Sequence, residues 1–241
     1  LVLIVFLIIN LKYIQPIVGK LGQNATVFMS YTACLFLAYY VLMHLPIIDF
    51  RAFAVGNNIQ KGMEIPAGAT MSEYEMLFIY KVNGVETEFS QADVMANKVP
   101  ETAEFVDRKD KLIKQGYVPP IHDFTIELDG SDYTEDMLKE PKLIMLISYD
   151  LEKADDDGLA KLEEFHQAAL KKGYKVIGMT ASDETLIKSV KDKHKLTFDY
   201  YFCDATTLKT IERANPSIVV LNKGTIVQKK HFNDIDKVTL N

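Results

Sequence analysis

Short apolar runs alternate with stretches of helical period between residues 142 and 230. The runs at 142–149, 175–180 and 198–203 are bounded by turn-forming or charged residues, a pattern typical of buried strands. Strands that alternate with helices of 10–15 residues predict βαβ units and a parallel sheet. The sequence therefore predicts an α/β core in this part of the chain.

Acidic and hydroxyl residues before the amphipathic stretches indicate where the helices begin, and Gly173 indicates where the first one ends. We expect one helix from a cap at Asp156 or Asp157 to about Lys172, one from Ser182 or Asp183 to about His194, and one over 205–214 after Asp204.

The C-terminal part has a different pattern. Pro216 leads into an apolar run, residues 222–224 suit a turn, and 225–230 return as a second strand. A closing helix is expected over 233–238. With this antiparallel hairpin, the sheet becomes a mixed sheet flanked by helices.

A small β-rich unit is predicted over 70–116. Residues 76–82 and 85–89 suit a hairpin around Asn83-Gly84, and Ser90 suits a helix N-terminus. Two interpretations remain for the rest. Residues 105–107 and 112–114 form a second hairpin around 108–111, or a single helix covers 101–115.

The N-terminal part is apolar. Apart from His44, no residue from 21 to 48 is charged or titrates near neutral pH, and residues 25–45 are long enough to span a bilayer as a helix. The alternative is a buried helix of a soluble domain. Residues 1–11 are too short to span, so we interpret them as the end of another membrane helix and the chain as the C-terminal part of a longer protein.

The segment over 49–69 is rich in glycine, asparagine and proline and suggests an irregular linker. The loop over 12–24 carries two lysines and no acid, which favours a cytoplasmic position. The chain after Ile48 is then expected in the periplasm, beyond a bacterial inner membrane.

Charge is distributed unevenly along the chain. All 33 acidic residues lie from Asp49 onward, against 25 lysines and arginines, a net charge of −8 for that part. An acidic body argues against nucleic-acid binding, which needs a basic face. The two cysteines, Cys34 and Cys203, are too few for a disulfide framework, and no pattern requires a metal or another cofactor.

The predicted core resembles the thioredoxin fold over 117–241. Residues 121–126 with Asp129-Gly130 resemble the first strand and turn of membrane-tethered, secreted thioredoxin-like proteins, and 176–181 resemble their central strand. Asn215-Pro216 matches their cis-proline position. The resemblance implies that Asn215 presents its backbone to an extended substrate.

The whole arrangement also resembles bacterial DoxX-family membrane proteins that carry a periplasmic thioredoxin-like domain. The matching residues are 44–51, 78–80 with 83–84, and 112–124. The resemblance implies that 1–11 and 25–45 are the last two of four membrane helices. It also implies a bilayer and a periplasmic or membrane protein as partners.

One departure from the thioredoxin pattern bears on activity. The loop Ser148–Gly158, where a redox thioredoxin has its nucleophilic cysteine, contains no cysteine and five acidic residues. The acids match a calcium loop only in part, because Lys153 stands at the first ligand position, and an acidic helix start is the simpler interpretation. We therefore expect a binding role for Tyr149, Asp150, Asn215 and Pro216.

Three hypotheses follow for function. The first is a binding or accessory module without a redox-active cysteine pair, tethered to the membrane. The second is an atypical thiol-disulfide oxidoreductase that uses Cys203 with a cysteine of a partner protein. The third is a structural tether. Cys203 is the single catalytic candidate, and its alternative role is a small buried residue that closes a strand.

Overall fold

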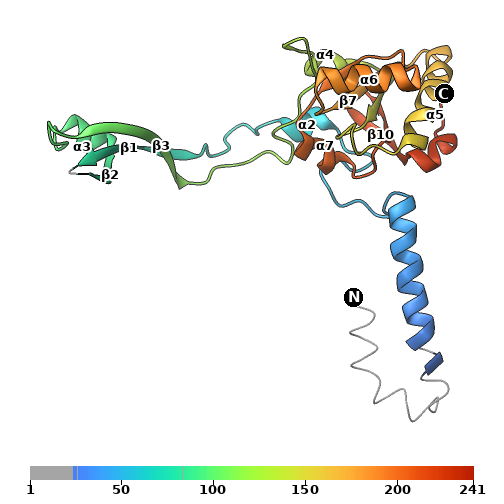
Figure 1. The fold of residues 1–241 in the computed structure, drawn as a ribbon, viewed down its shortest axis with the longest axis horizontal. Helices are drawn as coiled ribbons and strands as arrows, with labels where there is room; N and C mark the ends of the chain where they lie inside the picture. The colour runs from blue at the N-terminus through green and yellow to red at the C-terminus, as the bar shows by residue number, and fades with distance from the viewer. Residues whose placement is uncertain (1–23, 26, 83) are drawn as a thin grey trace. The chain divides into compact units, whose positions relative to one another are not determined.

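The computed structural model describes residues 24, 25, 27–82 and 84–241 (Figure 1). The chain divides into two compact units. The larger unit combines the chain up to Lys61 with Asp123–Asn241, and the small unit is Gly62–His122. The predicted membrane segment over 1–11 and the loop over 12–23 lie outside the described residues, as does Asn83.

The larger unit contains a seven-stranded mixed sheet in the order β10-β9-β6-β7-β8-β4-β5. Strands β6, β7 and β8 are parallel, and β9 runs antiparallel to both β6 and β10. The strands are β4 (Glu127–Leu128), β5 (Ser131–Asp132), β6 (Leu143–Ile147), β7 (Lys175–Thr180), β8 (Tyr200–Phe202), β9 (Ser217–Asn222) and β10 (Thr225–His231).

Each parallel strand is followed by a helix whose N-cap is an aspartate. Asp155, Asp183 and Asp204 accept hydrogen bonds from backbone N–H groups in the first turns of these helices, which satisfies donors that a helix start leaves unpaired. The helices of the larger unit are α4 (Thr134–Lys139), α5 (Asp156–Lys171), α6 (Glu184–His194), α7 (Ala205–Ile211) and the 3₁₀ helix η1 (Phe232–Lys237).

The sheet is buried on both faces. Alternate residues of β6 point to opposite sides, and all five are fully buried. On one face Ile144 and Leu146 pack in a cluster with Leu162 of α5 and Val190 of α6. Parallel strands that are covered on both faces appear in the sequence as uninterrupted apolar runs. For this reason the sequence pattern located β6 and β7.

This topology confirms the predicted thioredoxin-like α/β fold. The bounds differ at three places. The first strand was expected to begin at residue 121, but only the two-residue strand β4 forms there. Its single pairing with β8 joins Glu127 to Phe202. Helix α7 ends at Ile211 because Glu212 is extended and its carboxylate contacts Lys229. The closing helix is a 3₁₀ helix interrupted at Asp234.

The linker expected over 49–69 differs from the structure in its first part. Residues 56–59 run along β10: Gly56 N–H donates to Ile226 O (2.8 Å), and Ile59 N–H donates to Gly224 O (2.8 Å). Phe53 and Ile59 are buried, and α2 (Ile59–Met63) follows. Glycine and asparagine in this segment allow turns, but the unpaired edge of β10 gives the segment a partner.

The small unit is a three-stranded antiparallel sheet in the order β2-β1-β3 (Figure 1). Its elements are β1 (Glu73–Val82), β2 (Val85–Ser90), α3 (Gln91–Met95) and β3 (Glu104–Lys114). The predicted first hairpin is confirmed, and Ser90 forms a capping box with Asp93. Tyr80 packs edge-on against both Phe89 and Phe105.

The second hairpin predicted around 108–111 is wrong, as is the alternative helix over 101–115. Residues 104–114 form the single strand β3, which pairs with β1 over its whole length. Residues 107–111 contain no glycine or proline, and pairing with the ten-residue strand β1 outweighs the turn tendency of Asp107 and Asp110.

Residues 27–43 form a helix whose large apolar side chains are mostly exposed, including Phe28, Phe36 and Leu42. Among the residues that the structure describes, no helix is both long and apolar enough to cross a membrane. The membrane span predicted over 25–45 therefore stays a prediction.

Candidate functional site

The loop Ser148–Gly158 and Pro216 meet at one edge of the sheet. Loop 148–158 follows the carboxyl end of β6, and Pro216 immediately precedes β9. Because β9 is antiparallel to β6, Ile147 lies opposite Ser217. Two segments that are about 60 residues apart in the sequence are therefore brought together, as the thioredoxin resemblance implied.

Backbone and side-chain contacts join the loop to the proline. The Asp155 N–H donates to Asn215 O (2.8 Å), and Asn215 Nδ2 donates to Asp150 O (2.7 Å). The Asn215–Pro216 peptide bond is cis. A Cβ atom at Gly158 would lie 2.8 Å from Pro216 Cδ and 2.8 Å from Phe232 Cγ, so this close approach requires glycine.

The contacts of Asn215 leave one backbone group for a ligand. Its carbonyl already accepts from Asp155, its Nδ2 is bonded to Asp150 O, and its Oδ1 is buried. Within the described part of the chain, the backbone N–H of Asn215 has no acceptor. An extended ligand could therefore pair with this residue through its own carbonyl oxygen.

Most acids of the loop have internal partners. Asp150 lies 2.6 Å from the Lys153 ammonium, and this hydrogen bond lowers the pKa of Asp150. Asp155 caps α5, and Asp156 contacts Lys193 and His194 of α6. Tyr149 is half-buried, with the Lys209 ammonium 5.0 Å from its ring centroid.

Cys203 lies at the same edge of the sheet but two strands away from the loop. It follows β8, and β7 stands between β8 and β6 in the sheet. Neighbouring strands lie about 4.8 Å apart, so two strand spacings separate the thiol from the loop after β6 by about 10 Å. The residue is fully buried, and burial raises the pKa of its thiol to about 11. This environment disfavours the thiolate that disulfide exchange requires.

A buried charge cluster beside the loop was missed at the sequence level. Lys229 and Glu212, whose side chains are 4% and 3% exposed, lie 3.5 Å apart. Asp49 contacts Lys229 at 2.7 Å and Arg51 at 2.7 Å, and Arg51 also reaches Glu212 at 3.3 Å. Two acids and two bases from three distant segments therefore neutralise one another.

The electrostatics of Asp49 follow from this cluster. Burial alone would raise the pKa of its carboxyl group, but hydrogen bonds from Arg51 and Lys229 outweigh that effect and hold the pKa well below its usual range. The carboxylate therefore stays charged, and it fixes residues 49–51 to the larger unit. A lysine in a strand with otherwise alternating burial was the one signal that could have indicated a buried partner.

A groove of about 750 Å³ runs beside Asn215. One side is formed by residues 41–46, where His44 Nδ1 lies 2.7 Å from Asp234 Oδ2. The other side is formed by Lys153, Asp155, residues 212–215 and residues 231–233. Of the four residues predicted to bind, Asn215 lines this groove.

A second groove of about 390 Å³ adjoins the first and shares Arg51 and Arg213 with it. Its remaining lining residues are Tyr149, Thr206, Lys209 and Thr210. The two grooves together are lined by four lysine or arginine side chains and two carboxylates, one of which is the buried Glu212. Arg51 and Lys153 are paired with carboxylates, so Lys209 and Arg213 are the lining cations that make no ion pair within the described residues, although the chain after residue 48 is acidic.

Comparisons with known proteins divide between the two units. A family model described as a domain of unknown function (DUF8463) matches residues 74–115, which run from β1 to the end of β3. The comparison with curated proteins gave no match. The model that matches is not that of the DoxX family, so the DoxX resemblance stays a prediction.

Solved structures similar to this chain are thioredoxin-like domains. A thiol:disulfide interchange protein from Bacteroides sp. is 15% identical, with 48% of this chain and 82% of that chain covered and a TM-score of 0.37. The thioredoxin domain of a thiol-disulfide oxidoreductase from Bacteroides vulgatus is 17% identical, with 48% and 91% covered and a TM-score of 0.37. A secreted disulfide oxidoreductase from Mycobacterium tuberculosis is 17% identical, with 43% and 80% covered and a TM-score of 0.35.

Proposed function

We propose that the larger unit is a binding module that holds an extended, acidic polypeptide segment along the groove beside Asn215. In this proposal it carries out no thiol chemistry, and the apolar helix over 27–43 holds it at a lipid bilayer. The observation that carries the binding proposal is the basic lining of the groove in an otherwise acidic part of the chain.

The lining favours carboxylates. Lys153, Lys209 and Arg213 extend from the loop after β6 and from the region of α7, and Arg213 makes no ion pair within the described residues. Complementary charge raises the association rate and favours a correct partner over a wrong one. The overall charge of −8 after residue 48 repels an acidic partner elsewhere on the chain, so it directs that partner to this edge.

The backbone favours an extended segment. A peptide carbonyl that pairs with the Asn215 N–H would lie along the edge where β9 begins, and main-chain pairing of this kind supplies affinity without a demand for particular side chains. Lys209 and Arg213, which make no ion pair within the described residues, would then select acidic side chains of the same segment.

The competing oxidoreductase hypothesis requires a reactive thiol. The loop that carries it in redox thioredoxins has no cysteine, and Cys203 is buried with a raised pKa. No described residue provides a base next to Cys203 that would offset burial. We therefore favour binding over thiol exchange.

The bilayer proposal is supported by the exposed apolar helix. Residues 27–43 extend about 25 Å at 1.5 Å per residue, a little less than a hydrocarbon core of about 30 Å. Its exposed side chains include Phe28, Leu35 and Leu42, which lipid would cover. The lysines at 12 and 20 favour the cytoplasmic side, which would place the larger unit in the periplasm of a bacterium.

Binding is tested by fluorescence anisotropy with a labelled, glutamate-rich peptide of ten residues and the full chain in detergent. We expect saturable binding that weakens as salt rises, and at least a tenfold weaker affinity for Arg213→Glu. The matched control is Lys188→Glu on the exposed face of α6, which should bind as the native chain does. Equal affinity for a lysine-rich peptide, or no change in Arg213→Glu, would contradict the proposal.

Membrane attachment is tested separately by fractionation of bacteria that express the full chain. The native chain should remain in membranes after a sodium carbonate wash, and Phe36→Asp/Leu37→Asp should be released. Protease added to spheroplasts should digest the larger unit if it faces the periplasm. Recovery of the native chain in the soluble fraction would contradict the attachment.

A further inference from the structure

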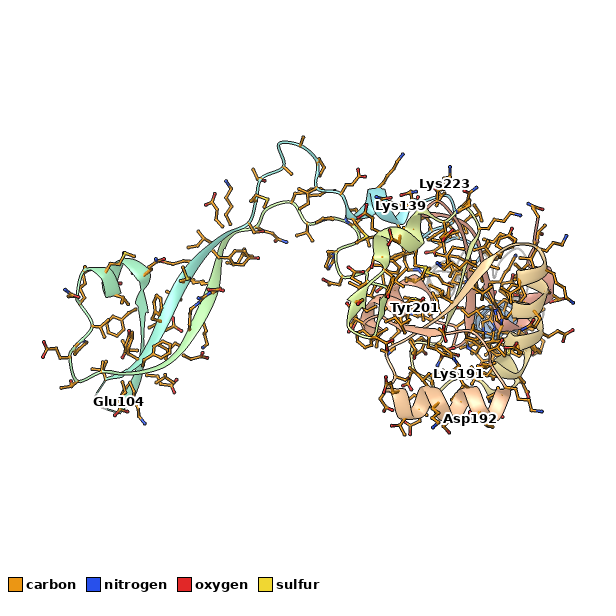
Figure 2. All side chains as sticks on the ribbon, turned by 90° about the horizontal axis from the view of Figure 1, so that it is seen from above. Glu104, Lys139, Lys191, Asp192, Tyr201 and Lys223 are labelled. Carbon is orange, nitrogen blue, oxygen red and sulfur yellow. The ribbon has the colours of Figure 1, made fainter. Side chains whose placement is uncertain are left out.

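Strand β3 is an unprotected edge of the small sheet. It pairs with β1 on one side, and the strand order β2-β1-β3 leaves its other side without a neighbour in the described chain. All 11 residues of β3 are exposed, including Phe105 and Ile113, which are each 58% exposed. Figure 2 shows the side chains that stand out along this strand, with Glu104 at its start. Long exposed edges of this kind are templates for pairing with another strand.

The sequence of β3 is complementary to its own reverse about Lys109. Arg108 and Asp110 flank the centre, Asp107 and Lys111 come next, and the outermost residues are Glu104 and Lys114. Between the charged pairs lie two apolar pairs, Val106 with Leu112 and Phe105 with Ile113.

We propose that a second copy of this chain pairs with β3 as an antiparallel strand, with a two-fold axis at Lys109, and that two small sheets thereby form one six-stranded sheet. In this register Arg108 lies opposite Asp110 of the second copy, and Asp107 lies opposite Lys111 of the second copy. Each pair occurs twice because the axis repeats it. This proposal concerns the small unit and does not rest on the groove or on its ligand.

The geometry of antiparallel pairing selects this register. Along an edge strand, only every second residue points its backbone N–H and C=O outward, so two copies must align outward residues with outward residues. A two-fold axis must then pass through a residue and not between two residues. An axis at Asp110 would place Lys109 opposite Lys111, and an axis at Arg108 would place Val106 opposite Asp110 and Phe105 opposite Lys111. Among these neighbouring axes, only Lys109 gives two opposite-charge pairs on each side, followed by pairs of apolar residues.

The faces of the sheet agree with this register. Arg108 and Asp110 lie on one face, where they already form a long ion pair of 3.4 Å within the chain. Two copies would gather four alternating charges there. Asp107 and Lys111 lie on the other face. Like charges meet once, at Lys109 itself, and the long lysine side chains can separate into solvent.

The pairing of β1 with β3 leaves the central residues regular. Register shifts occur where β3 carries Val106 and Ile113, so residues 107–111 run straight between them. Bulges bend an edge strand and often hinder pairing. Their position outside 107–111 keeps the five central residues available for a regular ladder.

The opposite edge of the sheet does not offer such a surface. Strand β2 has six residues, and its charged side chains are Glu86 and Glu88 alone. Paired with itself, β2 could form no opposite-charge pair. The proposed contact is therefore specific to β3 on charge as well as on length.

Disulfide crosslinking of the full chain in detergent tests the register. In a Cys34→Ser background, Lys109→Cys should form a disulfide-linked dimer under mild oxidation, because directly opposite residues lie about 4.5–5.5 Å apart between Cα atoms, within the range that a disulfide bridges. Lys111→Cys should form no such dimer. Residue 111 lies opposite residue 107 of the second copy, so the two introduced cysteines would be four residues, about 13 Å, apart along the strand. Glu88→Cys on β2 is the matched exposed control. Equal crosslinking of all three variants would overturn the proposal.

Charge exchange provides a second, independent test. Asp107→Lys/Asp110→Lys leaves the centre of β3 basic, and Arg108→Asp/Lys111→Asp leaves it acidic. Neither variant should self-associate in analytical ultracentrifugation at low salt, whereas an equimolar mixture should form heterodimers. Recovery in the mixture shows that both variants fold. The proposal would be overturned if the native chain stayed monomeric at concentrations up to about 100-fold above those of the crosslinking test. It would also be overturned if the mixture of the two variants stayed monomeric.

Discussion

The ammonium group of Lys229 on β10 lies 2.7 Å from the carboxylate of Asp49, which stands 180 residues earlier in the chain. The same ammonium donates to the backbone carbonyls of Phe53 (3.1 Å) and Ile211 (2.6 Å). One buried cation thus joins the segment after the apolar helix, the end of α7 and the C-terminal hairpin. The lining of the groove beside Asn215 depends on all three.

Replacement of Lys229 by methionine should destabilise the larger unit by about 3–5 kcal/mol, because Asp49 and Glu212 would remain buried with less compensation. Urea unfolding of the full chain followed by circular dichroism measures the change. The neighbouring substitution Lys230→Met, which removes no ion pair among the described residues, should change stability by no more than about 0.5 kcal/mol. Equal effects of the two substitutions would show that the buried cluster contributes little.

His231 should make stability depend on pH near neutrality. Burial lowers the pKa of this imidazole below its usual value; His44 reinforces the effect, and the carboxylates of Asp234, Glu212 and Asp155 oppose it. The neutral ring accepts a hydrogen bond from the Asn233 N–H (3.1 Å). Because the folded pKa is depressed, the contribution to stability is complete above the unfolded pKa of about 6.5 and is lost as pH falls through the folded pKa.

The measurement is the unfolding free energy between about pH 7 and pH 5 for the native chain and for His231→Gln. We expect the native value to fall toward acid pH and the variant to depend less on pH in that range. The two chains differ at His231 alone. A variant with an unchanged pH profile would show that His231 is not the titrating group.

Gly158→Ala should destabilise the contact between the loop after β6 and Pro216. In a helix, alanine is normally favoured over glycine by about 0.5–1 kcal/mol, but here the added Cβ would lie 2.8 Å from Pro216 Cδ. We therefore expect a net loss of about 1–3 kcal/mol by overpacking. Thermal unfolding shows whether the substitution lowers or raises stability. A variant more stable than the native chain would mean that the loop can move away from Pro216 at little cost in free energy.

Cys203 should react slowly with iodoacetamide. A pKa near 11 instead of 9.0 leaves about 100-fold less thiolate at neutral pH, and the buried sulfur must also be exposed by local opening. In a Cys34→Ser background, mass spectrometry should find labelling of Cys203 at least about 100-fold slower in the folded chain than in urea. Fast labelling of the folded chain would revive the oxidoreductase hypothesis.

The sequence by itself determined the local elements of the larger unit. Apolar runs located β6 and β7, and Asn215-Pro216 located the start of the C-terminal hairpin. Aspartates located the starts of α6 and α7, whereas the cap of α5 is Asp155 and not the expected Asp156 or Asp157. These signals are short-range, because a cap or a buried strand is encoded within a few neighbouring residues. The position of the loop Ser148–Gly158 next to Pro216 came from the thioredoxin resemblance, because it requires β9 to pair with β6.

Tertiary structure alone decided four further features. Residues 56–59 pair with β10, and Lys229 finds acids far along the chain; both depend on partners that no local pattern shows. Strand β3 runs straight through five charged residues because β1 lies beside it. Cys203 is fully buried, which a lone cysteine after a strand does not reveal. Long-range pairing and desolvation act between segments, so they are settled only when the chain is folded.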